Sequence, residues 1–189
     1  SFEIVGCTNP NSLNYNPNAN AVVAFGGALD NTFSTGGYFN GNQHLIFDAY
    51  DSFRIKSAMF YADNGNTITF ELRDNSGTVI DDTTLNVSSG PQRLTINFDV
   101  PAGNDYQLGI DGQNSGLYRN DSGANYPYDI GGLMSITRSS ASSDPTGYYY
   151  FYYDIEIDVP CSNNTTSIYN EELFLNNDSK KLYYNILDK

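Results

Sequence analysis

The sequence predicts an all-β protein, a two-layer antiparallel β-sandwich of jelly-roll type with little or no helix. Segments in which polar and apolar side chains alternate recur at short intervals, and Asn, Asp and Gly mark the turns between them. The apolar share of 39% comes largely from 16 Tyr and 11 Phe, which favour strands. No segment has the periodicity of a long amphipathic helix. A chain of 189 residues can bury the core that such a sandwich needs.

The alternating segments follow one another through the middle of the chain. Strands are expected at 43–50, 53–62, 67–73, 78–87, 92–100, 105–110, 133–138 and 147–159. In the third of these, Ile68, Phe70 and Leu72 share one face, as expected for a strand with one buried side. Residues 111–130 are expected to form a long polar loop.

The strand-rich region divides the chain into three parts. Residues 1–37, which are rich in Asn and Pro near their start, are expected to be irregular. Residues 38–161 are the predicted sandwich domain. Residues 162–189 combine a linker with a partial β segment that is too short for an independent domain. This last part would pack on the sandwich, pair with a partner, or belong to a longer chain.

The only two cysteines, Cys7 and Cys161, flank the predicted sandwich. The ends of a sandwich commonly lie close together, so one expectation is a disulfide, and the alternative is two free buried thiols. No run of about 18 apolar residues is present, so membrane insertion is not expected. The first residues also lack the features of a signal peptide, so an exported protein would already have lost its signal.

The tyrosine-rich strand at 147–159 has two faces of different chemistry. One face is apolar and fits a core. The other carries three tyrosines followed by three carboxylates, namely Tyr148, Tyr150, Tyr152, Asp154, Glu156 and Asp158. Buried carboxylates cost several kcal/mol each unless they are paired, so this face is expected to meet water, a cation or a partner. The tyrosines would offer rings on which sugars stack, as in carbohydrate-binding modules; the alternative is an aromatic ladder that only stabilises the sheet.

Two further groups of polar residues are candidate sites. Asp154 and Glu156, together with Asp48 and Asp51, could supply oxygen ligands for Ca²⁺, and a solvated acidic face is the alternative. In the expected long loop, a candidate ligand-binding group is formed by Tyr118, Arg119, Asn120, Tyr126 and Tyr128. Alternatively, Arg119 pairs with Asp121 or Asp129, and the tyrosines fix the loop.

The net charge and the types of residue present argue against several functions. A net charge of −13 argues against nucleic acid or an anionic membrane surface as the partner. The single histidine, His44, shows no spacing that pairs it with a nucleophile, and it is expected to be structural. No pair of carboxylates can be singled out as a glycosidase site among 22 acidic residues. The protein is therefore not expected to be an enzyme.

Residues 6–10 (GCTNP) and 14–19 (NYNPNA) resemble the GCTDP…NYNP.A repeat of secreted and surface proteins of the Bacteroidota. The acidic residues and Gly-Ser-Cys that usually end the repeat are missing, so Cys7 lacks its expected local partner, which favours Cys161. The body is similar to accessory β-sandwich modules of the same proteins, in stretches such as 44–49, 71–74, 117–120 and 126–128. Residues 182–188 are similar to an early strand of the type IX C-terminal sorting domain, but that domain is truncated here.

The resemblance implies export by the type IX secretion machinery to the outside of the cell or to its outer surface, and no catalytic role. Two functions from different classes are then expected. The first is a non-catalytic binding or adhesion module for a glycan or another surface polymer. The second is a structural subunit or spacer of a surface assembly, joined to neighbouring subunits through edge strands and the C-terminal segment.

Overall fold

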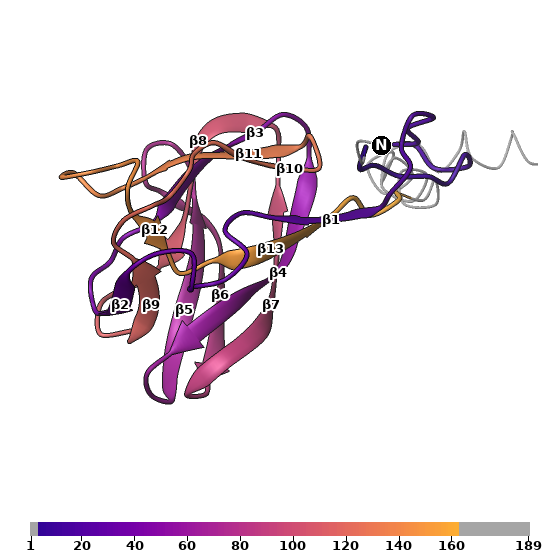
Figure 1. Ribbon diagram of the computed structural model, residues 1–189. Helices are drawn as coiled ribbons and strands as arrows, with labels where there is room; N and C mark the ends of the chain where they lie inside the picture. The colour runs from indigo at the N-terminus through magenta and orange to yellow at the C-terminus, as the bar shows by residue number, and fades with distance from the viewer. Residues whose placement is uncertain (1–3, 163–189) are drawn as a thin grey trace, which may run out of the picture.

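The computed structural model of the protein describes residues 4–162, which form two packed antiparallel sheets and a small N-terminal lobe (Figure 1). The first sheet has seven strands in the order β1-β13-β4-β9-β12, with β2 paired to β9 and β7 paired to β4. Its strands are β1 (Val23–Gly26), β2 (Gly36–Phe39), β4 (Phe53–Ala62), β7 (Gly90–Val100), β9 (Leu117–Asn120), β12 (Tyr149–Tyr150) and β13 (Tyr153–Asp158).

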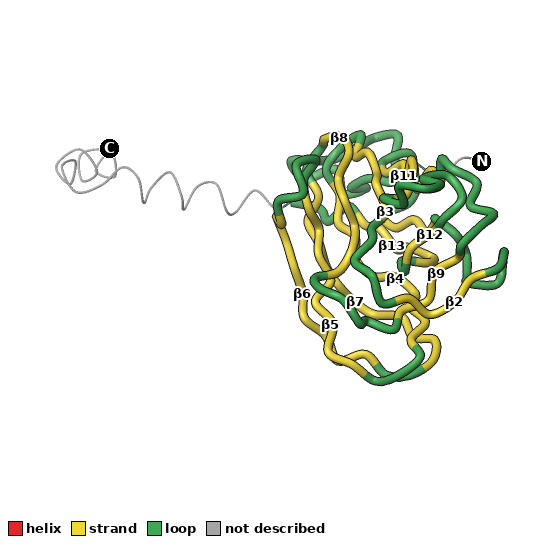
Figure 2. The backbone as a smooth tube through the Cα atoms, turned by 90° about the vertical axis from the view of Figure 1, so that its left-hand side faces the viewer, coloured by secondary structure: helices red, strands yellow, loops and turns green. Residues whose placement is uncertain are grey.

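The second sheet has six strands in the order β10-β11-β3-β8-β5-β6. Its strands are β3 (Leu45–Ala49), β5 (Asn66–Arg73), β6 (Val79–Val87), β8 (Gly103–Ile110), β10 (Tyr128–Ile130) and β11 (Met134–Ser139). Figure 2 shows strands and connecting loops, and no helix is assigned within residues 4–162. The predicted all-β sandwich is therefore confirmed.

Aromatic and aliphatic side chains from both sheets fill the space between them. Phe60 of the first sheet and Phe70 of the second meet with ring centroids 4.6 Å apart. Phe47, Phe98 and Leu108 are fully buried around them. Phe70 and Phe98 alternate with polar residues along β5 and β7, which is why these strands could be located from the sequence.

Two segments differ from the expectation. Residues 1–37 are not irregular throughout, because β1 pairs with β13 and β2 pairs with β9. The expected loop at 111–130 contains β9 and β10. All four of these strands are three or four residues long, and such short runs show no clear alternation in the sequence.

The N-terminal lobe, which we call the knot, comprises residues 4–22 and 160–162. A disulfide joins Cys7 to Cys161 with a Cα–Cα distance of 5.0 Å, which confirms that expectation. The side-chain oxygens of Asn9 and Asn16 each accept a hydrogen bond from the backbone N–H two residues later, so both Asn-Pro steps of the repeat-like motif form tight turns. In Figure 1, β1 and β13 run side by side between the knot and the sandwich.

Candidate functional site

The tyrosine-rich strand is broken in the structure. Phe151 has a φ of 64° and Asp154 a φ of 42°, both in the left-handed region. The chain therefore leaves β12, which pairs with β9, and re-enters the sheet as β13 beside β4. The regular alternation assumed for residues 147–159 fails at this kink.

The kink places Tyr150 and Tyr152 in the interior, so the predicted three-tyrosine sugar platform is wrong. Tyr152 has no exposed surface and Tyr150 is 3% exposed. The Tyr152 ring packs on Phe60 and Phe70 at centroid distances of 4.9 and 6.0 Å, and its hydroxyl donates to the Gly109 carbonyl. Burial raises the pKa of the Tyr152 hydroxyl well above its ordinary value, so it remains a donor. Tyr152 thus links the two sheets.

The third predicted platform residue, Tyr148, is half-buried and stacks on Tyr150 with nearly parallel rings 5.9 Å apart. The Arg119 guanidinium lies between the rings of Tyr148 and Phe39, at 4.9 and 4.8 Å from their centroids. Its nearest carboxylate is Asp121, at 3.7 Å. Arg119 is therefore held mainly by cation–π contacts, and its pairing with Asp121 agrees with the structural alternative.

Asn120, also a predicted ligand contact, is fully buried and has a structural role. Its Oδ1 accepts a hydrogen bond of 2.8 Å from the Tyr153 hydroxyl, and its Nδ2 donates to the carbonyls of Asn31 and Ser34 at 3.1 and 2.9 Å. The side chain thereby ties the loop between β1 and β2 to the sheet. A buried amide with these partners is not accessible to a ligand.

Tyr126 and Tyr128 fix the loop that carries them. Their rings meet edge to face at 5.3 Å, the Tyr126 hydroxyl donates to the Tyr148 carbonyl at 2.7 Å, and the Tyr128 hydroxyl accepts from the Asn125 N–H at 2.9 Å. Burial raises the pKa of Tyr126. Both residues therefore match the structural alternative for this loop.

Two of the three carboxylates of the predicted acidic ladder are paired with basic side chains from neighbouring strands. Asp154 contacts Arg93 of β7, and the Glu156 carboxylate accepts from Lys56 at 2.8 Å and from Ser57 at 2.5 Å. Burial alone would raise the pKa of Glu156, but the hydrogen bonds from Lys56 and Ser57 lower it below its ordinary value. Asp154 and Glu156 are thus paired with protein cations, whereas Asp158 has no ion pair within residues 4–162, and burial raises its pKa.

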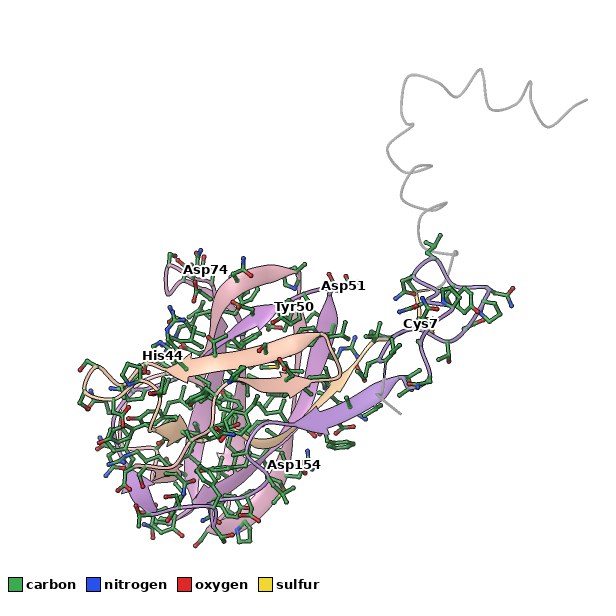
Figure 3. All side chains as sticks on the ribbon, turned by 45° about the horizontal axis from the view of Figure 1, so that its top comes forward. Cys7, His44, Tyr50, Asp51, Asp74 and Asp154 are labelled. Carbon is green, nitrogen blue, oxygen red and sulfur yellow. A yellow bond between two sulfur atoms is a disulfide. The ribbon has the colours of Figure 1, made fainter. Side chains whose placement is uncertain are left out.

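The two other residues of the expected calcium site lie elsewhere. Asp48 is on β3 of the other sheet and accepts from the Asp105 N–H at 2.9 Å. Asp51 follows β3 and lies far from Asp154 in Figure 3. The structure therefore does not bring the four carboxylates together, and no group of three or more His, Cys, Asp or Glu suited to a metal occurs within residues 4–162.

An aromatic pair on β2 and β9 joins Tyr38 to the half-buried Tyr118, and only Tyr118 is among the predicted site residues. Tyr38 is 53% exposed and stands directly opposite Tyr118 in the β2–β9 register. The rings meet edge to face at 5.5 Å. Leu117, which precedes Tyr118 in β9, is fully buried in the core, so this outer tyrosine pair lies on the face turned away from the second sheet.

A polar cavity of about 240 Å³ adjoins the outer tyrosine pair. We call it the loop-end pocket; it is lined by Asn40, Asp63, Asn64, Gly65, Asn66, Asn114, Ser115 and Gly116. Asn40 follows Tyr38 by two residues and Gly116 precedes Tyr118 by two, so pocket and ring pair are roughly 7 Å apart along the strands. In Figure 2, β2 and β9 lie side by side at this end of the sandwich.

Only an indirect signal in the sequence points to these residues. Tyr38 stands in the short segment Gly-Gly-Tyr-Phe-Asn, and residues 63–66 lie between two expected strands, where Asp, Asn and Gly favour a turn. The same residue types also provide amide and carboxylate groups for polar ligands. The convergence of three separate turns on one cavity depends on strand pairing, which composition does not reveal.

A larger cavity of about 340 Å³ lies at the opposite end, where the knot meets the sandwich. Its lining includes Phe53, Val100, Pro101 and Pro160 together with Asn14. The Asn14 side chain also donates a hydrogen bond to the Pro160 carbonyl and accepts one from the Ser162 N–H, so this region fastens the two segments of the knot to each other. We therefore assign it a structural role.

His44 is partly buried beside the Arg73 cation, and burial followed by this charge lowers its pKa from 6.5 to about 4. The unfolded chain takes up a proton as the pH falls through 6.5, whereas the folded protein does so only near 4. Stability is therefore expected to fall across this window, by about 2 kcal/mol after allowance for partial exposure. Urea unfolding between pH 7 and pH 4.5 measures the loss. In the His44→Gln variant, the free energy of unfolding should fall less steeply with decreasing pH. An identical pH dependence in both proteins would show that His44 does not cause the loss.

No protein-family model, curated protein or solved structure matches this chain. Within residues 4–162 there is also no helix long and apolar enough to span a membrane.

Proposed function

We propose that the protein is a non-catalytic extracellular module that binds a carbohydrate or a carbohydrate-bearing surface through the outer tyrosine pair and the loop-end pocket. The observation that carries this proposal is the exposed ring of Tyr38, held against Tyr118 and adjacent to a cavity lined by amides and a carboxylate. Aromatic rings stack on the C–H faces of sugars, and amide and carboxylate groups form hydrogen bonds with sugar hydroxyls.

The scaffold supports binding by a preformed site. β2 and β9 pair over four residues, and Asn120 and Tyr153 anchor the loop that leads into β2. Few side chains and loops therefore have to become ordered when a ligand binds, and the small entropy cost favours a higher affinity.

Export to the extracellular space or the outer cell surface by the type IX machinery is part of the proposal. It is supported by the repeat-like motif at residues 6–19 and by the Cys7–Cys161 disulfide, since disulfides persist mainly in oxidising compartments. The exposed Tyr38 ring and the high negative charge suit a neutral polymer better than a nucleic acid.

Replacing both Tyr38 and Tyr118 by alanine is expected to weaken glycan binding about tenfold to a hundredfold, because two stacking rings are lost. A glycan array followed by calorimetry with the strongest hit measures the change. Tyr50→Ala removes another exposed tyrosine, at the β3–β4 turn, and serves as the control. Equal binding by the double variant and the control would reject this surface as the site.

A structural subunit remains the second candidate, favoured by two long strands, β6 and β7, that each pair on one side only in the described region. Asp81 stands opposite the buried Leu72 in the β5–β6 register and so points to the core side of β6. An inward-pointing charge protects an edge strand from association, which counts against assembly through β6. Light scattering on the full chain and on a chain ending at Ser162 separates the candidates. An oligomer that depends on residues 163–189 would favour assembly.

A further inference from the structure

We infer that the loop-end pocket selects a neutral sugar residue, binding its vicinal hydroxyls with Asp63 as the acceptor and excluding anionic sugars. This inference rests on the proposed function, because it names the class of carbohydrate for the same site.

Asp63 is fixed in place while its carboxylate remains free. Its backbone N–H donates to the Gly116 carbonyl at 3.0 Å, and its carbonyl accepts from the Ser89 hydroxyl at 2.8 Å. Its Oδ1 lies against Gly116, where an added Cβ would approach to 2.0 Å. Within residues 4–162, no side chain or backbone group donates a hydrogen bond to this carboxylate, so both oxygens can accept from a ligand.

The neighbouring amides supply oriented donors. The Oδ1 of Asn40 accepts a hydrogen bond from the Gly116 N–H at 3.1 Å, which fixes the orientation of the Asn40 amide. No acceptor for the Asn40 Nδ2 is found in the described part of the chain. Asn66 is fully engaged, since its Nδ2 donates to the Asn114 carbonyl and its Oδ1 accepts from Thr67. Asn66 therefore shapes the pocket, while Asn40 and Asp63 face the ligand.

A pair of adjacent hydroxyls matches this arrangement. One hydroxyl donates to the Asp63 carboxylate and its neighbour accepts from Asn40 Nδ2, so two hydrogen bonds form without burying an unpaired group. The charged acceptor strengthens the first bond. The next sugar of a bound oligosaccharide would then lie beside Tyr38 and Tyr118, because each tyrosine is two residues along its strand from a residue that lines the pocket.

The charge of the pocket opposes acidic sugars. No Lys or Arg lines it, and Asp63 is its one charged lining residue. Five of the six basic residues in the described region donate to carboxylates elsewhere, and the sixth, Arg119, lies between two rings. A uronate carboxylate placed beside Asp63 would meet an uncompensated like charge, which costs affinity.

The test compares neutral hexose oligosaccharides with uronate oligosaccharides of the same length, using the full chain and its Asp63→Asn variant. The wild type is expected to bind the neutral set and not the uronates. Asp63→Asn should weaken neutral binding about tenfold to a hundredfold and reduce the discrimination between the two sets by a similar factor. The exposed Asp82 of β6 provides the control Asp82→Asn, which changes the net charge equally at a distant site.

The outcomes separate this inference from the proposed function. Neutral binding that depends on Tyr38 and Tyr118 but has unchanged affinity and selectivity in Asp63→Asn would overturn the inference and leave the function standing. A wild-type protein that binds neither set would overturn both. Equal effects of Asp63→Asn and Asp82→Asn would show a general charge effect and would also overturn the inference.

Discussion

Replacement of Cys7 and Cys161 by alanine is expected to lower the free energy of unfolding by up to about 5 kcal/mol. The disulfide closes a loop with a sequence separation of 154 residues, and in the chain-entropy model such a long loop restricts the unfolded chain strongly. The loss should appear as a lower denaturation midpoint in guanidinium.

Two comparisons control this experiment. The wild type with reductant should approach the double variant, and the variant itself should not respond to reductant. Tyrosine fluorescence and circular dichroism should show whether the sandwich remains folded when the knot is released. A wild-type midpoint that does not change after verified reduction would contradict the expected stabilisation.

Removal of the Tyr152 side chain is expected to be almost as damaging. Tyr152→Ala leaves a cavity between Phe60 and Phe70 and should cost about 3–5 kcal/mol. Tyr152→Phe keeps the ring but leaves the Gly109 carbonyl without its donor, which should cost about 1–3 kcal/mol. Equilibrium denaturation of both variants measures the two terms separately.

The matched control is Tyr50→Ala, since Tyr50 is 61% exposed and its loss should change stability by less than about 0.5 kcal/mol. If Tyr152→Ala behaved like the control, Tyr152 would have to be exposed, and the sugar-platform hypothesis for the tyrosine-rich segment would return.

The longer strands could be predicted because their patterns are strong. β5 and β7 show clean alternation, and the structure buries the residues expected, such as Ile68 and Phe98. The pattern is less reliable where a strand is irregular. In β4 the register with β7 shifts between Ile55 and Ser57, and beyond Ser57 the buried residues are Ala58, Phe60 and Ala62. A register shift changes the face of every later side chain, and the sequence does not mark it.

The candidate site was harder to predict because it depends on contacts between distant segments. The left-handed conformation of Phe151, which a Phe residue seldom adopts, ends the alternation of the tyrosine-rich segment, and all side chains from Tyr149 to Tyr153 are buried. The partners of Asp154 and Glu156 come from β7 and β4, so their neutralisation follows from strand order. Tyr118 was identified, but its partner Tyr38 lies in a short, glycine-rich strand.

The covalent link at the knot also determines how the protein would carry a mechanical load. Tension applied to the chain before Cys7 and after Cys161 passes through the S–S bond, and the intervening residues form a side loop outside the line of force. The hydrogen bonds between strands then bear none of that tension. A sandwich suspended in this way keeps the outer tyrosine pair and the loop-end pocket in shape while the chain is pulled, and reduction of one bond would expose the whole fold to the load.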